Sequence, residues 1–215
     1  MCGIVGYTGP KQAYPVILKG LQRLEYRGYD SSGVALLKDG KLSVYKKKGK
    51  VAELEQEMLD KDTSANIGIG HTRWATHGEP SDRNAHPHRS ANGRFSMIHN
   101  GIIENYAQIK NELVKQGYSF SSDTDTEVLL NFIESIQTNN NCDVEEALRI
   151  ALKRVTGAYC ILLIDENDPD TIIAARKGSP LVIGVGKGEH FLASDASPII
   201  EYTKEVVYVN DYELA

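Results

Sequence analysis

Apolar residues recur along the chain at two spacings, and these spacings predict its helices and strands. Spacings of three and four predict helices over residues 13–25, 51–59 and 106–116, and two more that begin near residues 125 and 144. Short apolar runs predict strands at residues 4–7, 34–37, 42–45, 67–71, 95–99, 159–164, 171–174, 181–185, 191–194 and 206–209. Because helices come in separate blocks and most strands neighbour other strands, this order favours an α+β fold with antiparallel sheets.

Local residue signals indicate where several of these elements begin and end. A polar loop is predicted from Tyr26 to Gly33, and Asp39-Gly40 predicts a hairpin between the second and third strands. The segment Thr124-Asp125-Thr126-Glu127 has the pattern of a capping box that opens one helix, and Asp143 can cap the next. Asp168-Pro169-Asp170 predicts a turn between two of the last strands.

The composition of the 215 residues is that of an ordinary globular protein, with 41% hydrophobic and 25% charged residues. Without an internal repeat or a flexible linker, this length predicts a single domain over residues 1–215. A net charge of −5 argues against a nucleic-acid partner, and no apolar run approaches the roughly 20 residues of a membrane span. Because the cysteines are few and no signal peptide is visible, we expect a soluble, cytoplasmic protein.

Cys2 is the first candidate for chemistry because it directly follows the initiator methionine. Once Met1 is removed, one residue carries both a thiol nucleophile and a free α-amine. The amine has an ordinary pKa of about 7.7–8.0 and the thiol about 8.5, so the amine can take the thiol proton near neutral pH. This N-terminal-nucleophile arrangement predicts acyl transfer. The alternative is that Cys2 is a small buried hydrophobe, which is the commoner role of a free cysteine.

Three further positions could serve an acyl-transfer site. Asn100-Gly101 follows a predicted strand and could form an oxyanion hole, although the same pair favours a type I′ turn. Arg73 could clamp a carboxylate or form an ordinary surface ion pair. Asp125 could hold an ammonium group or simply stabilise the first turn of its helix. Together, Arg73 and Asp125 could recognise the two charged groups of a free amino acid.

Five histidines lie in or beside the long irregular stretch from residue 74 to residue 93, and they raise the question of a zinc site. They are His71, His77, His86, His88 and His99. Their spacing matches neither the H-E-x-x-H motif nor a Cys/His ligand pattern, so we expect hydrogen-bonded histidines and no metal. The glycines at residues 184–188 match no dinucleotide or phosphate motif, and we expect no cofactor.

Several segments together resemble the N-terminal-nucleophile glutamine amidotransferases, and among them the glutaminase domains of the glutamine–fructose-6-phosphate aminotransferases. The segments that carry this resemblance are residues 2–6, 24–31, 71–80, 84–88, 99–105, 124–127, 178–181 and 193–195. The related phosphoribosyl-pyrophosphate amidotransferases share the N-terminal cysteine nucleophile that Cys2 represents here, but they differ around Arg27 and Arg73. The resemblance spans nearly the whole chain.

The resemblance implies a role for each candidate residue. Cys2 attacks the side-chain amide of L-glutamine with its own α-amine as base, Asn100 and Gly101 stabilise the oxyanion, and water hydrolyses the resulting thioester. The residues implied in binding the substrate are Arg73, Trp74, Thr76, His77, His86 (through its backbone) and Asp125, and Arg27 is implied in supporting Cys2. The stretch with Trp74 and His77 is similar to the glutamine loop of the family, which closes over the substrate.

The family fold is a four-layer αββα sandwich, which agrees with the α+β prediction and goes beyond it. In the family, two sugar-phosphate isomerase domains follow the glutaminase domain, the full-length enzyme is a homo-oligomer, and the ammonia converts fructose 6-phosphate to glucosamine 6-phosphate. This sequence stops at Ala215, so we expect the isomerase domains to be absent from it. Two alternatives stay open: an ammonia-supplying domain of another amidotransferase, and a non-catalytic glutamine-sensing module.

Overall fold

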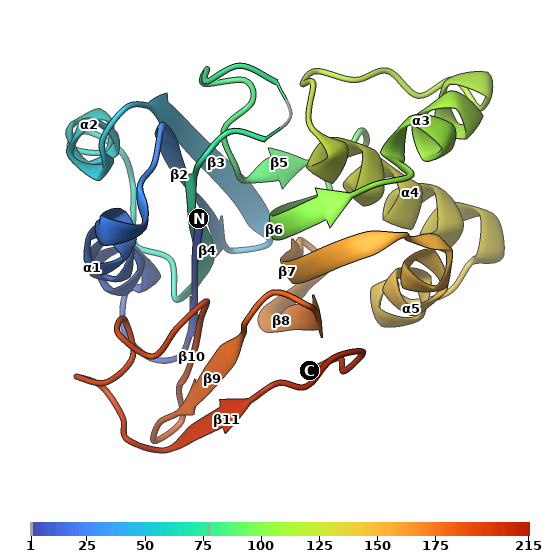
Figure 1. Cartoon of the computed structure of the whole chain (residues 1–215). Coiled ribbons are helices and arrows are strands. Elements are labelled where there is room, and N and C mark those ends of the chain that lie inside the picture. Colours follow the sequence, from blue (N-terminus) through green and yellow to red (C-terminus); the bar gives the residue numbers. More distant parts are fainter. Residues whose placement is uncertain (1, 77) are drawn as a thin grey trace.

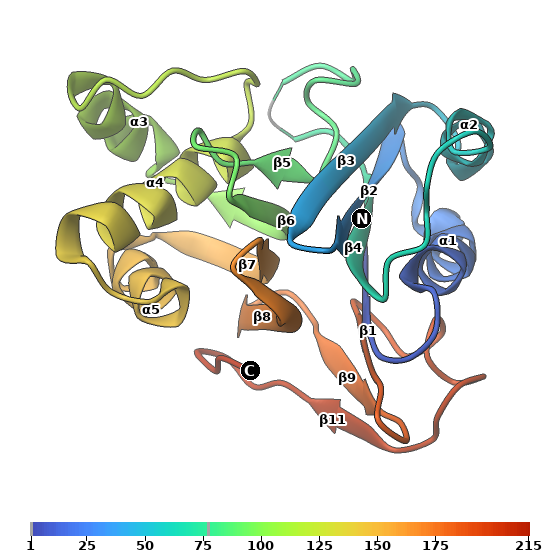
Figure 2. The ribbon, with the colours of Figure 1, turned by 180° about the vertical axis from the view of Figure 1, so that it is seen from behind.

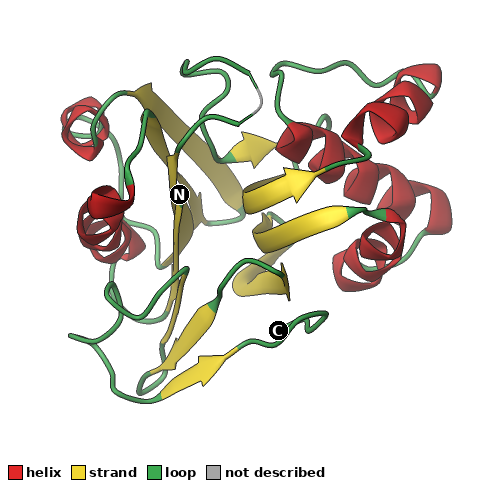
Figure 3. Ribbon diagram, viewed as in Figure 1, coloured by secondary structure: helices red, strands yellow, loops and turns green. Residues whose placement is uncertain are grey.

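The computed structural model describes residues 2–76 and 78–215 of the chain, and these residues form four layers. Figures 1 and 3 show two helical layers on the outside and two sheets between them. The helices are α1 (Ala13–Leu24) and α2 (Val51–Glu57) on one side, and α3 (Tyr106–Lys115), α4 (Asp125–Asn140) and α5 (Val144–Arg154) on the other. Figure 2 shows the same layering from behind. The predicted α+β fold with antiparallel sheets, layered αββα, is confirmed.

The large sheet is antiparallel, with the strand order β11-β9-β10-β1-β4-β2-β3. Its strands are β1 (Gly3–Thr8), β2 (Ser31–Lys38), β3 (Lys41–Lys48), β4 (Ile67–Arg73), β9 (Val182–Val185), β10 (His190–Ala193) and β11 (Val206–Tyr208). The small sheet has the order β5-β6-β7-β8. Its strands are β5 (His88–Arg89), β6 (Phe95–Ile103), β7 (Gly157–Asp165) and β8 (Asp168–Lys177). Cys2 directly precedes β1, which is the central strand of the large sheet. Cys2 therefore lies midway across the sheet, at the end where β1 begins.

Alternation along the strands builds the core between the layers. On β1, Ile4 belongs to the apolar cluster between the two sheets, whereas Val5 belongs to the cluster under α1 and α2. On β6, Ile98 faces the same inter-sheet cluster, and Met97 packs into the cluster under α3, α4 and α5. Each sheet is therefore buried on both faces, which fixes the two sheets relative to each other.

Several predicted boundaries are confirmed. Asp143 caps α5, with its carboxylate accepting a hydrogen bond from the N–H of Glu146 over 2.8 Å. Thr124 caps α4 by accepting from the N–H of Glu127. The capping box is only half formed, because the Glu127 carboxylate accepts from Ser121 and Ser122 instead. These contacts fix the start of α4 at Asp125.

Three boundary predictions are wrong, each because strand pairing overrides local residue type. Residues 31–33 belong to β2 instead of a loop, and Gly33 is small there because a Cβ would lie 2.2 Å from the His86 carbonyl oxygen. Asp168-Pro169-Asp170 opens β8 instead of forming a turn, since Asp168 pairs with Asp165. Asn100-Gly101 lies within β6, where Gly101 pairs with Tyr159, so the type I′ turn alternative is wrong.

Candidate active site

A cavity of about 340 Å³ opens where the ends of both sheets meet the start of α4. Nine of the ten predicted site residues line it, namely Cys2, Arg27, Arg73, Trp74, Thr76, His86, Asn100, Gly101 and Asp125. The tenth, His77, lies outside the described residues. The fold thus brings together residues that are spread over more than half of the sequence.

The pairing of β1 with β4 places Cys2 beside the end of β4. Gly3 lies opposite Thr72, and its N–H donates a hydrogen bond to the Thr72 hydroxyl over 3.1 Å. A Cβ at Gly3 would lie 2.6 Å from that hydroxyl oxygen, so a glycine is required after the cysteine. This close pairing sets Cys2 next to Arg73 and Trp74, which follow Thr72.

The Cys2 sulfur is bracketed by the backbone of Trp74. The Trp74 N–H donates to Sγ over 3.1 Å, and the thiol lies 3.5 Å from the Trp74 carbonyl oxygen. Burial raises the pKa of the Cys2 thiol, and the Trp74 N–H and the nearby Arg73 charge partly offset that rise. The sulfur therefore has a donor already aimed at its thiolate form.

The Cys2 carbonyl oxygen is held by two side chains. Arg27 Nη1 donates to it over 3.3 Å, and Asn100 Nδ2 donates over 3.1 Å. Arg27 is itself fixed, because Nη1 also donates to the Ser194 hydroxyl over 3.0 Å and Nη2 lies 3.1 Å from an Asp195 oxygen. Arg27 thus lies where a residue that supports the nucleophile is expected.

Asn100 and Gly101 reach the cavity from β6 in the small sheet. The Asn100 Oδ1 atom lies 2.9 Å from Nε2 of His71, so both ends of the amide are engaged. Gly101 has φ of +133°, and a Cβ there would lie 2.0 Å from the Ala158 carbonyl oxygen. Only glycine fits this position, which lets the backbone turn toward the cavity. The pair lies beside Cys2, as an oxyanion hole requires.

Arg73 ends β4 and is buried, which excludes the surface ion pair considered from the sequence. Its Nη2 donates to the Gly78 carbonyl oxygen over 3.1 Å, and its Nη1 lies 3.9 Å from the Asp30 carboxylate. The Asp30 carboxylate also accepts hydrogen bonds from the Ala75 N–H and the Ser31 hydroxyl. Asp30, which sequence reasoning assigned no role, therefore positions both the guanidinium and the chain after it.

Asp125 is the first residue of α4 and is buried with its carboxylate at the cavity wall. One oxygen accepts a hydrogen bond from the Ile103 N–H over 2.8 Å. A carboxylate has further lone pairs, so the same group can still accept from an ammonium ion. Asp125 thus holds the helix-start position, and its geometry also permits the binding role that the sequence offered as the alternative.

Trp74 and His86 form other parts of the wall. Trp74 is 55% exposed and lies against Gly28, where a Cβ would approach the indole ring to 3.1 Å. His86 is buried, and its Nε2 lies 2.8 Å from the Thr126 hydroxyl oxygen. Its ring is engaged with α4, and its carbonyl oxygen lies against Gly33. Thr76 lines the cavity from the same loop as Trp74.

Six other residues that line the cavity were not predicted to belong to the site. They are His99, Ile102, Thr124, Thr126, Ser179 and Pro180. The two threonines flank Asp125, and their hydroxyls contact His86, His88 and His99 at 2.8–3.0 Å. The signal for them was present, because Ser179-Pro180 and the threonines lie in segments that carried the family resemblance.

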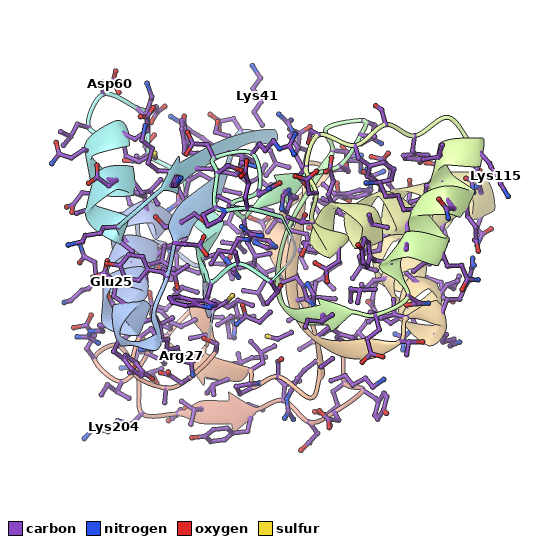
Figure 4. The ribbon with its side chains drawn as sticks, turned by 45° about the horizontal axis from the view of Figure 1, so that its top comes forward. Glu25, Arg27, Lys41, Asp60, Lys115 and Lys204 are labelled. Carbon is purple, nitrogen blue, oxygen red and sulfur yellow. The ribbon has the colours of Figure 1, made fainter. Side chains whose placement is uncertain are left out.

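The rest of the described structure gives fewer indications of function than the cavity does. Within residues 2–76 and 78–215, no group of three or more His, Cys, Asp or Glu side chains is arranged to hold a metal ion. Among the helices described, none has the length and apolar character needed to cross a membrane. Charged side chains such as Lys41, Asp60 and Lys115 point outward at the rim of the molecule (Figure 4).

Comparison with known proteins places this arrangement in a family. A glutamine amidotransferase domain model matches residues 71–201. Curated proteins named glutamine–fructose-6-phosphate aminotransferase (isomerizing) are similar over the whole chain. That of Bacteroides thetaiotaomicron is 58% identical over 100% of this chain and 35% of its own length. That of Aquifex aeolicus is 52% identical over 100% of this chain and 36% of its own length. The chain thus spans about a third of these relatives.

Solved structures extend the likeness to three dimensions. Glutamine phosphoribosylpyrophosphate amidotransferase from B. subtilis has a TM-score of 0.84 and 28% identity over 99% of this chain and 46% of its own. A glutamine aminotransferase class-II domain protein from Silicibacter pomeroyi shares the fold, with a TM-score of 0.61 and 17% identity over 98% of this chain and 92% of its own. Given the family match over residues 71–201, the chain belongs to the glutamine amidotransferase domain family and has the fold of its N-terminal-nucleophile class.

Proposed function

We propose that this chain hydrolyses L-glutamine to glutamate and ammonia. The observation that carries the proposal is the meeting of the Cys2 thiol, the Asn100 amide and the buried Arg73 guanidinium in one cavity. Arg73 would bind the α-carboxylate of glutamine through its planar fork, and Asp125 would accept hydrogen bonds from the α-ammonium group. With both charged groups on the α-carbon held, the side-chain amide at the other end of the substrate would face Cys2.

The reaction follows from the groups around the sulfur. In a chain that begins at Cys2, the α-amine takes the thiol proton, and Sγ attacks the amide carbon of glutamine. The new oxyanion accepts hydrogen bonds from the Asn100 side chain and the Gly101 backbone. The tetrahedral intermediate then expels ammonia, which leaves with a proton from the α-ammonium group. A γ-glutamyl thioester remains on Cys2.

Water completes the cycle. The α-amine, again neutral, takes a proton from a water molecule that attacks the thioester carbon, and glutamate and the Cys2 thiol are released. The segment with Trp74, Thr76 and His77 would cover the substrate and exclude bulk water, and His86 would line the wall behind it. Arg27 would hold the Cys2 carbonyl in place throughout. Every step uses groups of the chain and water, so the proposed reaction needs no cofactor.

The relatives suggest where the ammonia goes. Their name couples glutamine to fructose 6-phosphate, and they are about three times as long as this chain. We infer that residues 1–215 act as one glutaminase domain that supplies ammonia for glucosamine 6-phosphate synthesis in a homo-oligomeric full-length enzyme. Sugar-phosphate isomerase domains, outside this sequence, would use that ammonia. The 215-residue chain alone should therefore release ammonia but form no amino sugar when fructose 6-phosphate is added.

A glutaminase assay on matched cysteine variants tests the proposal. The wild-type chain with Cys2 as its first residue should release glutamate from L-glutamine, and Cys2→Ala should not. Cys142→Ala is the control. This variant should hydrolyse glutamine at the wild-type rate, because Cys142 lies outside the cavity. Calorimetry should still show glutamine binding to Cys2→Ala through Arg73 and Asp125. Binding without turnover in the wild type would contradict the proposal and favour a glutamine-sensing module.

A further inference from the structure

His71 and Asn100 join the two sheets directly behind the candidate oxyanion hole. His71 lies on β4 of the large sheet, and Asn100 lies on β6 of the small sheet. The His71 ring is fully buried, and its Nε2 lies 2.9 Å from Asn100 Oδ1. His71 does not line the cavity, so it cannot contact a substrate there. Its contact with the active site runs through Asn100.

The chemistry of the two side chains fixes which atom donates. The Oδ1 atom of an asparagine can only accept a hydrogen bond, so His71 must donate through an Nε2–H. This tautomer leaves Nδ1 without a proton, and Nδ1 has no hydrogen-bond partner among the described residues. A buried acceptor without a hydrogen-bond partner costs less free energy than a buried N–H without one. This difference agrees with a proton on Nε2 and none on Nδ1.

The Cys2 carbonyl oxygen, which can only accept, and the His71 N–H together set the orientation of the Asn100 amide. With Oδ1 directed at His71, the NH2 group points the other way, and one of its protons is donated to the Cys2 carbonyl oxygen over 3.1 Å. The second proton is left for the cavity that Asn100 lines. If the amide were rotated by 180°, Oδ1 would face the Cys2 carbonyl oxygen, and neither NH2 proton would reach that oxygen or the cavity.

The surroundings keep His71 in the neutral form that this requires. The ring lies 4.3 Å from the ring of buried His86, centroid to centroid. Burial lowers the pKa of His71 to about 3, and the nearby His99 and Arg73 charges add to the shift, although the Asn100 side chain and the His99 backbone oppose it. A neutral His71 ring carries one N–H, and the contact with Asn100 Oδ1 places that proton on Nε2.

We propose that His71 is a positioning residue that holds the Asn100 amide with its N–H groups toward Cys2 and the oxyanion. This inference rests on the proposed glutaminase function. It adds a residue that lies outside the cavity and would act only through Asn100. The loss of one oxyanion donor typically lowers turnover by about 10²–10³-fold. An Asn100 amide that His71 no longer holds can still donate to the oxyanion for part of the time. Removal of the His71 hydrogen bond should therefore lower kcat by about 10-fold to 100-fold.

A matched pair of variants tests this role. In His71→Gln the amide nitrogen can take the place of Nε2, whereas in His71→Asn it takes the place of Nδ1 and cannot reach Asn100. We expect His71→Gln to keep kcat for glutamine hydrolysis within about fivefold and His71→Asn to lose about 10-fold to 100-fold, with KM changed little in both. Thermal melting of both variants identifies any loss of fold.

An inhibitor comparison separates positioning from general damage. The γ-aldehyde analogue of glutamine forms a tetrahedral adduct with a thiol, so its affinity depends on the oxyanion hole, whereas L-glutamate binding does not. His71→Asn should weaken aldehyde binding by the same factor as kcat, leave glutamate binding intact and leave the alkylation rate of Cys2 unchanged. Wild-type kcat in His71→Asn, or an equal loss of aldehyde and glutamate binding, would overturn the proposal. A wild-type chain without glutaminase activity would instead refute the proposed function.

Discussion

The backbone N–H of Trp74 donates a hydrogen bond to the Cys2 sulfur over 3.1 Å. Trp74 is the first residue after β4, and the segment it begins is the one proposed to cover the substrate. Burial raises the pKa of the Cys2 thiol, while this N–H and Arg73 favour the thiolate. The conformation of the segment and the reactivity of the nucleophile are therefore linked through one backbone group.

Alkylation of Cys2 should depend steeply on pH. Because burial raises the thiol pKa above its ordinary value, the reactive thiolate should still be increasing with pH at pH 8.5. Mass spectrometry of the N-terminal peptide after short exposure to iodoacetamide measures the rate. L-glutamate should protect Cys2 and leave Cys142, which is outside the cavity, unprotected. A flat rate from pH 7 upward would show instead that the thiolate already predominates.

Tryptophan fluorescence should report closure over the substrate. Trp74 is the single tryptophan of the chain, is 55% exposed and lines the cavity. If its segment closes over bound glutamine, the indole loses water contact, and the emission of Cys2→Ala should shift to shorter wavelength with saturable dependence on L-glutamine. D-glutamine at the same concentrations is the control. An emission maximum that does not move at saturating L-glutamine, with binding shown by calorimetry, would rule out burial of Trp74.

Residue type made Cys2, Arg73, Asn100-Gly101 and Asp125 candidates, but each also had a structural alternative, and the family resemblance was needed to assign their roles. Arg27, Trp74, Thr76 and His86 were predicted from the resemblance alone. The fold adds that they face one cavity. His77, predicted with them, lies outside the described residues, so its role stays a prediction.

The relation between His71 and Asn100 could not be predicted in the same way. The two residues are 29 positions apart on strands of different sheets, and they meet only because the inter-sheet core packs β4 near β6. The position of Asn100 shows the same limit. Asn-Gly pairs favour tight turns, yet the ladder between β6 and β7 extends through Gly101 to Ile103. Pairing with a distant strand outweighs a local preference that is worth about 1 kcal/mol.

Arg73→Lys should weaken substrate binding more than turnover. The lysine keeps the charge but loses the planar fork, and a charge-assisted hydrogen bond contributes about 1.5–3 kcal/mol. We expect KM for glutamine to rise about 10-fold to 100-fold while kcat falls less than about fivefold. Arg149→Lys, on the surface of α5, is the matched control and should match the wild type. A normal KM with a reduced kcat would place Arg73 in the chemical step instead of the carboxylate clamp.

Retention of Met1 should nearly abolish activity without disturbing the fold. With Met1 attached, the Cys2 nitrogen is an amide and cannot act as a base, whereas in a chain that begins at Cys2 it is an amine with a pKa of about 7.7–8.0. Two preparations that differ only in Met1, verified by intact mass, should melt alike and differ by at least about 100-fold in kcat, as expected for loss of a general base. Full activity with Met1 present would refute the role of the α-amine.

Stability should fall as the pH is lowered from 7 to 5 because buried histidines are held neutral. Burial lowers the pKa of His71 to about 3 and lowers those of His86 and His88 well below the ordinary value of 6.5. In the unfolded chain these groups take up protons below about pH 6.5, whereas the folded chain excludes them, so the stability present above that pH is lost on acidification. Each histidine adds a slope of up to about 1.4 kcal/mol per pH unit.

Urea unfolding at pH 7, 6 and 5 measures this slope. The midpoint should decrease over a range that lies above the titration of most carboxylates. His88→Gln should reduce the number of protons taken up on unfolding by about one, and the pH slope should decrease accordingly. This holds even if the variant is less stable at every pH. A constant midpoint from pH 7 to pH 5 would mean that the buried histidines take up protons inside the folded protein.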